Sequence, residues 1–168
     1  MYVNISIYSI DKFKIFQKWL YKKVKLLSYI TSFLLVAIWG GLRFLSYDVE
    51  IYLACAFIFP FCVHAFAWFV SYEQIKNNLV LKYGAEQTFE FDEDGVKVKQ
   101  KSINGEYIYE YIYTDFLNVY KWKKYYFIFV TRTNAFIMDR DTFIVGKEEE
   151  FDSMLKQIYG KRFINKAK

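Results

Sequence analysis

The stretch IYLACAFIFPFCVHAFAWFVSY, residues 51–72, decides the fold, because it contains twenty-two consecutive residues without a charge. As an α-helix it would extend about 33 Å, which is enough to cross the hydrocarbon core of a bilayer with some tilt. Ten of its residues are Ile, Leu, Phe or Val, and each favours insertion by roughly 0.3–0.6 kcal/mol. Their sum outweighs the penalties of Pro60 and His64, so we expect a transmembrane helix here.

A second apolar run, LLSYITSFLLVAIWGGL at residues 26–42, precedes this stretch and contains seventeen residues without a charge. Its helix would span about 26 Å and cover a thin hydrocarbon core, with the Arg43 side chain reaching to the interface. The loop from Arg43 to Glu50 is eight residues long, so the two helices must run antiparallel. A soluble core that buries both helices is the alternative, but the polar remainder of the chain is too short to cover them.

Lysine and arginine residues flank the two apolar runs unequally. Only Arg43 lies between the runs. Six lysines precede the first run: Lys12, Lys14, Lys18, Lys22, Lys23 and Lys25. By the positive-inside rule, both termini are cytoplasmic and the connecting loop, with Asp48 and Glu50, faces outward. No small-residue cleavage pattern follows the first run, so we expect a retained anchor and not a cleaved signal peptide.

Two features of the apolar runs concern helix packing. Ala37 and Gly41, with Gly40 beside them, form a small-residue pattern that lets helices approach closely. Packing within the hairpin is the simpler interpretation of this pattern. Pro60 predicts a kink in the second helix, because proline removes a backbone hydrogen bond and its ring crowds the preceding turn.

His64 is the single histidine of the chain and lies inside the second apolar run. In hydrocarbon it requires a polar partner, which Ser32 or a tyrosine hydroxyl of the first helix can supply. A metal or proton-relay role together with Cys62 is the less favoured alternative. Cys55 and Cys62 are seven positions apart, about 10 Å along a helix, which is beyond the reach of a disulfide.

The N-terminal residues predict a strand followed by an amphipathic helix. Tyr2–Tyr8 alternates in polarity, and Ser9 is well placed to cap a helix over residues 10–25. The apolar face of this helix contains Phe13, Phe16, Leu20 and Val24. Two interpretations carry equal weight: the helix lies on an anionic inner leaflet, or it packs against the soluble domain with its lysines in solvent.

Beyond Gly84 the pattern changes from helical to strand periodicity, and the 23% content of aromatic residues suits half-buried strands. Asp94-Gly95 and Asn104-Gly105 mark tight turns, so successive strands should pair as antiparallel hairpins. Lys123-Lys124 supplies a further polar turn. We expect strands at residues 88–92, 96–101, 106–113, 117–122, 125–130 and 135–138.

Residues 148–159, EEEFDSMLKQIY, form an amphipathic helical pattern with acidic residues in the first turn, and Gly160 ends it. The sequence as a whole predicts a membrane α+β protein. Its parts are an N-terminal strand and amphipathic helix, a two-helix transmembrane hairpin, and a small antiparallel sheet or partly open barrel with a C-terminal helix. The expected divisions are a cytoplasmic N-terminal arm at 1–25, the hairpin at 26–72 with spans 26–42 and 51–72, a helical linker at 73–84 and the β-domain at 85–168.

Four segments follow the spans in a recognisable order: FEFDEDGVKVK at 89–99, YIYTDFLNVYKWKKYYFIFV at 111–130, NAFIMDRDTF at 134–143 and EEEFDSMLKQ at 148–157. With the strand-like arm and the two spans, this order resembles the YcxB-like membrane protein family over nearly the whole length. The resemblance implies a bacterial inner-membrane protein whose cytoplasmic domain is similar to bacterial pleckstrin-homology-like (PH-like) domains. Its motifs are structural, and the family brings no activity or site residues to carry over.

The sequence does not predict an enzyme. The single histidine and both cysteines lie in a predicted span, and no HExxH, GxSxG, P-loop or CxxC motif occurs. Among the carboxylates, Asp92–Asp94 is typical of a turn and Glu148–Glu150 of a helix start. We therefore expect no catalytic residue, no cofactor and no metal site.

The expected function is a non-catalytic binding or regulatory module that is anchored in the membrane and presents its β-domain to lipid headgroups or to a protein partner. The alternative is a small accessory subunit of a transporter or envelope assembly, with His64 at a helix interface. Nucleic acid is not an expected partner, because the net charge of +5 arises partly from lysines beside the first span and no base-reading motif occurs.

Anionic lipid headgroups are the expected ligand of the basic residues. The cluster Lys121–Tyr126 is the one basic and aromatic turn of note, and a solvated turn with its aromatics in the core is the preferred interpretation over lipid contact. The acidic turn at Asp92–Asp94 argues against specific phosphoinositide recognition. The candidate headgroup contacts are Lys14, Lys18, Lys22, Lys23, Lys25, Lys121, Trp122, Lys123 and Lys124.

Overall fold

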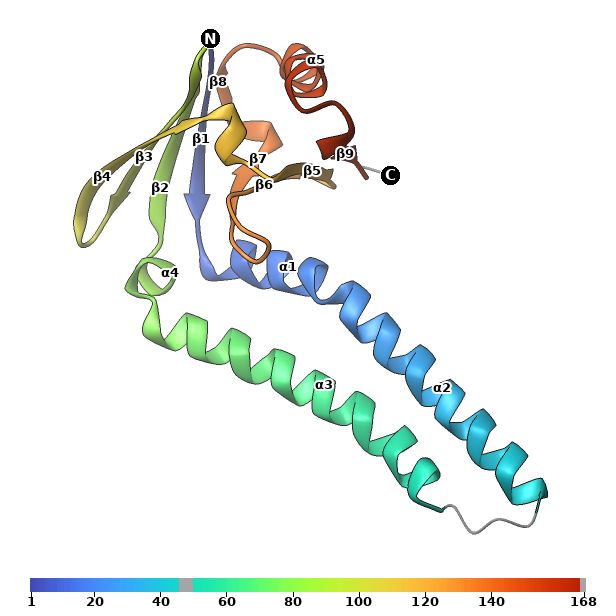
Figure 1. Cartoon of the computed structure of the whole chain (residues 1–168). Coiled ribbons are helices and arrows are strands. Elements are labelled where there is room, and N and C mark those ends of the chain that lie inside the picture. The colour runs from blue at the N-terminus through green and yellow to red at the C-terminus, as the bar shows by residue number, and fades with distance from the viewer. Residues whose placement is uncertain (46–49, 167–168) are drawn as a thin grey trace. The chain divides into compact units, whose positions relative to one another are not determined.

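The computed structural model describes residues 1–45 and 50–166, and it divides into two compact units. The β-domain contains Met1–Phe16 and Asn78–Lys168, and the helical hairpin contains Gln17–Asn77. The helices of the described residues are α1 (Ile10–Leu20), α2 (Lys22–Phe44), α3 (Glu50–Asn77), α4 (Leu79–Tyr83) and α5 (Glu148–Tyr159) (Figure 1). The chain thus has the α+β arrangement that the sequence predicted.

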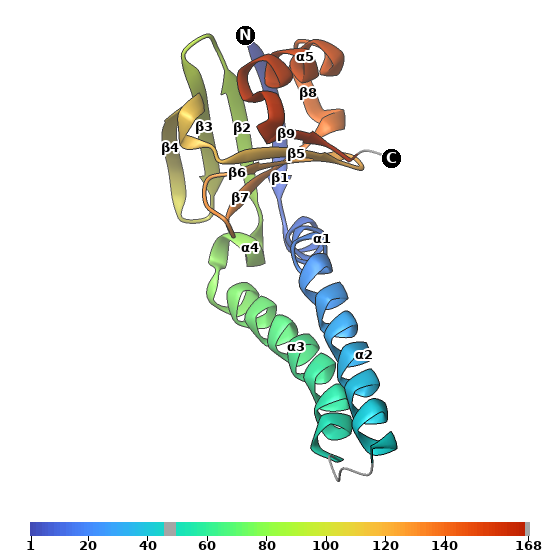
Figure 2. The ribbon, with the colours of Figure 1, turned by 45° about the vertical axis from the view of Figure 1, so that its right-hand side comes forward.

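Two sheets form the β-domain (Figure 2). The first has the strand order β4-β3-β2-β1-β8 and the second the order β7-β6-β5-β9. Neighbouring strands are antiparallel, except that β5 and β9 are parallel. The strands are β1 (Tyr2–Tyr8), β2 (Ala85–Phe91), β3 (Gly95–Ser102), β4 (Gly105–Ile112), β5 (Asn118–Trp122), β6 (Tyr125–Phe129), β7 (Ala135–Asp139), β8 (Phe143–Val145) and β9 (Phe163–Asn165).

Strand β1 lies inside the first sheet, between β2 and β8, and this position changes the domain division expected from the sequence. It pairs with β2 along its whole length, from Tyr2 opposite Phe91 to Tyr8 opposite Ala85. The helical hairpin is therefore an insertion between two paired strands. The β-domain does not begin at residue 85, and residues 1–25 do not form a separate arm, because hydrogen bonding between remote strands overrides proximity in sequence.

The expected linker at 73–84 is also divided between the two units. Helix α3 runs to Asn77. Asn78 then starts α4, because its side-chain Oδ1 accepts a hydrogen bond from the Leu81 N–H at 3.1 Å. Leu81 is buried, so α4 is part of the β-domain and not a free connection.

The β2–β3 turn follows the geometry that the sequence predicted. Asp92 Oδ1 accepts hydrogen bonds from the N–H groups of Asp94 and Gly95 at 3.0 and 2.9 Å. Position 95 requires glycine, because a Cβ atom there would lie 2.2 Å from the carbonyl oxygen of Tyr111 on β4. This turn therefore fixes the register of both β2 and β4 against β3.

The core of the β-domain lies between the two sheets and α5. Phe151 of α5 is fully buried, and its ring meets those of Tyr2, Phe91 and Tyr126 at centroid distances of 5.4, 4.8 and 5.4 Å. These edge-on contacts join β1, β2 and β6, so one phenylalanine links both sheets to the helix. Helix α5 has the bounds that the sequence predicted.

Of the two interpretations of the N-terminal helix, packing against the β-domain is confirmed for its first half. Phe13 is buried, and the Phe16 ring lies 5.3 Å from that of Phe127. The helix extends to residue 25 as predicted: Tyr21, between α1 and α2, keeps helical dihedral angles, and its N–H donates to the Gln17 carbonyl at 2.9 Å. Val24 is 49% exposed, so the predicted apolar face does not extend that far.

The helical segment Ile10–Phe44, which contains α2, and helix α3 are both long and apolar enough to cross a membrane, and only 6% and 11% of their most apolar stretches are buried. Ser28, Ala56 and Ala67 are the buried positions of the two helices among the described residues. The predicted close approach at Gly40 and Gly41 is not observed, because a Cβ atom at either position would meet no described atom within 4 Å.

A tyrosine hydroxyl satisfies His64, as the sequence predicted. The Oη atom of Tyr29 on α2 lies 2.6 Å from Nε2 of His64 on α3. Helix α3 continues through Pro60 without interruption. The expected outward-facing loop at residues 43–50 falls largely on residues 46–49, which lie outside the described residues.

A first prediction concerns the inserted hairpin. Residues 85–168 alone should not fold, because they lack β1, which pairs with β2 and β8 in the first sheet. Residues 1–16 joined to residues 78–168 by a flexible Gly-Ser linker of about twelve residues should fold as a soluble domain. Near-UV circular dichroism and dispersed amide NMR signals would distinguish the two. Equal folding of both fragments would show that β1 is dispensable.

Candidate functional site

The predicted basic and aromatic cluster at residues 121–126 contains both buried and exposed side chains. Strand β5 ends at Trp122 and β6 begins at Tyr125, with Lys123 in the left-handed region at φ 50°. Lys123 and Lys124 are exposed at this turn. Lys121 is only 6% exposed. Its ammonium group pairs with two carboxylates of α5 and is not presented at the turn, which argues against the headgroup contact expected from the sequence.

The Lys121 side chain belongs to a compact network of charges beneath α5. Its Nζ atom lies 2.6 Å from Glu148 Oε1 and also bonds Asp152. The Tyr126 hydroxyl donates to Asp152 Oδ1 at 2.6 Å, and Arg140 Nε donates to Glu148 Oε1 at 2.7 Å. Two cations thus face two carboxylates, and the network fixes α5 to β5, β6 and the Arg140–Thr142 turn.

The ionisation of this network follows from its contacts. Burial alone would raise the pKa of the Glu148 carboxyl, but hydrogen bonds from Lys121 and Arg140 outweigh burial and hold that pKa below its ordinary value. Burial raises the pKa of the Tyr126 hydroxyl, and its hydrogen bond to Asp152 raises it further. Glu148 is therefore held ionised and Tyr126 protonated near neutral pH, which suits a structural role and not proton transfer.

A second polar network joins β1 to the second sheet. Asn4 and Ser6 are completely buried. Asn4 Nδ2 donates to the Asp139 carbonyl at 2.7 Å, and the Asp139 N–H donates to Ser6 Oγ at 2.7 Å. Lys12 of α1 lies 3.4 Å from the Asp139 carboxylate. The sequence analysis missed this network, although polar residues at alternate positions of a strand were a signal that it could have used.

The remaining candidate lysines lie on the first part of the chain. Four of them are exposed, Lys14, Lys18, Lys22 and Lys23, and Lys25 is half-buried. Trp122 is half-buried, and the Nζ atom of Lys123 lies 4.8 Å from its ring centroid. Trp122, Lys123 and Lys124 therefore form an exposed basic and aromatic tip on the β-domain.

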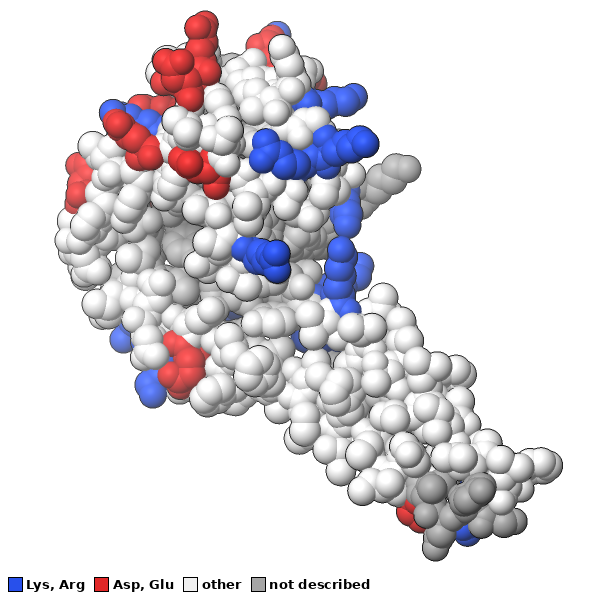
Figure 3. All heavy atoms as spheres, viewed as in Figure 1, with Lys and Arg blue, Asp and Glu red and all other residues white. Residues whose placement is uncertain are grey.

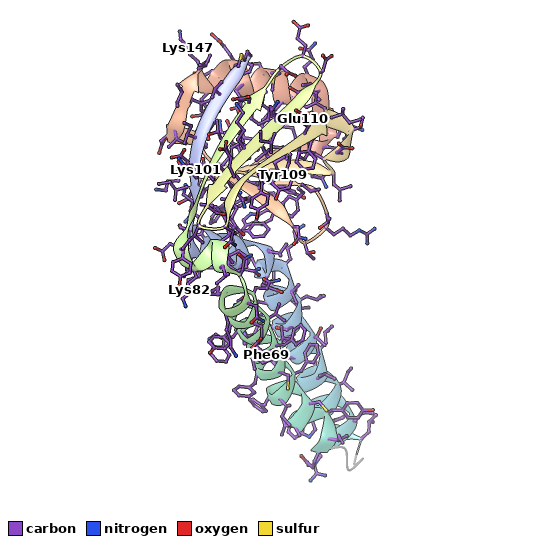
Figure 4. All side chains as sticks on the ribbon, turned by 90° about the vertical axis from the view of Figure 1, so that its left-hand side faces the viewer. Phe69, Lys82, Lys101, Tyr109, Glu110 and Lys147 are labelled. Atoms are coloured by element: carbon purple, nitrogen blue, oxygen red, sulfur yellow. The ribbon has the colours of Figure 1, made fainter. Side chains whose placement is uncertain are left out.

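The outer edge of the first sheet is the other notable surface of the β-domain. Among the described residues, β4 has a strand neighbour on one side only, which is β3. Figure 4 labels Tyr109 and Glu110 on this strand. At its C-terminal end an open depression of about 500 Å³ is lined by residues that include Asp92, Asp94 and Asp115. Acidic side chains gather on this side of the β-domain in the view of Figure 3.

No group of three His, Cys, Asp or Glu residues in the described part of the chain could hold a metal ion. No protein-family model, curated protein or solved structure matches the chain. The resemblance to the YcxB-like family therefore stays a prediction, and the function has to be argued from the geometry.

A second prediction tests the charge network. Replacing Lys121 with Met should destabilise the β-domain by about 2–3 kcal/mol, because it removes the cation beside Asp152 and one of the two cations beside Glu148. We place the cost below that of a fully buried pair because Glu148 and Asp152 are 25% and 23% exposed. Guanidinium denaturation of the detergent-solubilised chain, followed by near-UV circular dichroism, measures it. Lys123→Met is the matched control, and an equal loss in both variants would contradict the network's role.

A third prediction concerns alkaline pH. Burial raises the pKa of Tyr8 and of Tyr113 from 10.0 to about 12 in the folded chain. Because the folded pKa lies above the unfolded one, the stabilisation is complete below pH 10 and is lost as the pH rises towards 12. Tyrosinate absorbance should therefore appear later in the folded chain than in denaturant. Tyr113→Phe should reduce the pH dependence, and ionisation of every tyrosine near pH 10 would contradict the prediction.

Proposed function

We propose that the chain is a membrane-anchored, non-catalytic binding module that holds its β-domain at the cytoplasmic face of a bacterial inner membrane. One observation carries this proposal: two apolar helices with little buried surface are inserted between paired strands of a compact β-domain. The helices supply the anchor, and the β-domain supplies the surface that is presented.

The exposed surface of the helical hairpin supports its insertion into lipid. Phe33, Phe57 and Phe61 are each about three-quarters exposed, and Phe69, labelled in Figure 4, is also exposed. Figure 3 shows a hairpin surface that is almost free of charged side chains except at its end. Apolar patches of this extent are unfavourable in water, whereas a bilayer solvates them.

The two connections of the hairpin support a presenting role for the β-domain. The chain leaves the first sheet after Tyr8 and returns at Ala85, and these two residues are opposite each other in the β1–β2 ladder. A domain that is held at two adjacent points loses more rotational freedom than one on a single tether.

Lysines before the first span support an inner-leaflet orientation. Lys14, Lys18, Lys22 and Lys23 are exposed, and each basic residue near an anionic leaflet contributes about 1 kcal/mol. The tip formed by Trp122, Lys123 and Lys124 has the same chemistry. His64 has its partner within the hairpin at Tyr29 and requires none from a second protein. This contact gives no support to the alternative of an accessory subunit.

A fourth prediction tests anchoring and topology together. In a Cys55→Ser, Cys62→Ser background, a membrane-impermeant maleimide should label Glu50→Cys in intact bacterial cells but not Lys161→Cys. Both variants should become labelled when the cells are opened. The protein should stay in the membrane fraction in high salt and urea and leave it only in detergent.

Two results would count against the proposed function. Release of the chain by urea would show that the helices do not cross the bilayer. Labelling of Lys161→Cys in intact cells would place the β-domain outside. The two outcomes are independent, because the first concerns insertion and the second concerns orientation.

A further inference from the structure

Strand β4 has no strand neighbour on its outer side within the described part of the chain. The Ile112 N–H donates to Asp115 Oδ2 at 2.9 Å and not to β3, so residue 112 turns its N–H away from the sheet. The β3–β4 register contains no shift, from Gly95 opposite Ile112 to Ser102 opposite Gly105. Because orientation alternates along an antiparallel strand, Glu106, Ile108 and Glu110 also direct their N–H and C=O groups outward.

The side chains of β4 leave this edge accessible on both faces of the sheet. Ile108 and Ile112 are 55% and 58% exposed on one face, and Tyr107 and Tyr109 are exposed on the other. Edge strands are commonly protected by lysine, proline or a bulge, because an open edge accepts another strand. None of these protections occurs within β4, whose sequence is GEYIYEYI.

The charges around this edge indicate the chemistry of the strand that would fit. Glu106 and Glu110 lie on the strand itself, and Asp92, Asp94 and Asp115 surround its C-terminal end. Lys97 of β3 lies 2.8 Å from Glu110, and Lys101 of β3 is opposite Glu106, so these two lysines offset the two glutamates. The three aspartates leave the C-terminal end of the edge acidic, so it favours a basic partner.

A second copy of the chain fits less well than another protein. Two β4 strands would have to pair antiparallel about a two-fold axis to keep the sheet faces aligned. Such pairing, centred on Ile108, would place Glu106 of each copy opposite Glu110 of the other. Like charges directly opposite each other across two strands are unfavourable.

We propose that β4 accepts an added strand from a basic, extended segment of a partner protein. The proposal rests on the proposed function, because it names the class of partner that the anchored domain would bind. The added strand would hydrogen-bond to the backbone of Glu106, Ile108 and Glu110. It would carry basic residues opposite the two glutamates and apolar or β-branched residues between them.

The test uses the full chain in lipid nanodiscs and a fluorescein-labelled peptide, Thr-Lys-Val-Thr-Val-Lys-Thr amide. Ile108→Pro removes an outward N–H without removing a bond to β3, so the domain should fold and peptide affinity should fall about tenfold or more. Ile108→Val retains the N–H and is the matched control. Fluorescence anisotropy measures binding, and near-UV circular dichroism verifies the fold.

A charge exchange tests the chemistry of the partner independently. The double variant Glu106→Lys, Glu110→Lys should lose affinity for the lysine peptide and bind the peptide Thr-Glu-Val-Thr-Val-Glu-Thr amide instead. This gain of binding cannot result from a folding defect. Both findings together would support an added basic strand at β4.

Three outcomes would overturn the proposal. The first is equal binding of the lysine peptide to the wild-type chain and Ile108→Pro, and the second is equal binding of both peptides to the wild-type chain. The third is a wild-type dimer that Ile108→Pro dissociates, which would assign the edge to a second copy. Each variant is also tested for extraction by urea, so failure of the anchor is recognised separately from failure of the edge.

Discussion

The ladder between β1 and β2 is the interaction on which the rest of the structure depends. It joins residues 2–8 to residues 85–91, although the whole helical hairpin lies between them in the chain. Without this ladder the first sheet would lose a central strand, and β8 would lose its partner. The buried network of Asn4, Ser6 and Asp139 would also disappear, so the second sheet depends on the same strand.

Local patterns were sufficient to predict most elements but not their long-range partners. Residues 2–8 were predicted as a strand from their alternation, and the turns at Asp94-Gly95 and Asn104-Gly105 were predicted from their residue types. Nothing local in residues 2–8 specifies that β2, some eighty positions later, is the partner. The two short strands β8 and β9, of three residues each, were missed because such segments contain too few residues for a period.

The residues of the candidate site show the same difference between local patterns and long-range partners. Lys121 and Lys123 are two positions apart on the predicted basic turn, yet one is buried against α5 and the other is exposed. The sequence shows both as lysines beside aromatic residues, and only the carboxylates of Glu148 and Asp152, supplied from another element, explain the burial. The lysines in the sequence therefore predicted a basic surface at this turn. The ion pairs in the structure show that Lys123 belongs to that surface and Lys121 does not.

The insertion between β1 and β2 also has a consequence for biosynthesis. Seventy-six residues separate Tyr8 from Ala85, so at about 5–20 residues per second the ribosome needs roughly four to fifteen seconds to complete them. During that interval β1 has emerged without its partner while the two apolar helices are synthesised. An unpaired apolar strand can aggregate during this time. Strand β1 is short and has the polar residues Asn4 and Ser6 along one face, which lowers its tendency to aggregate.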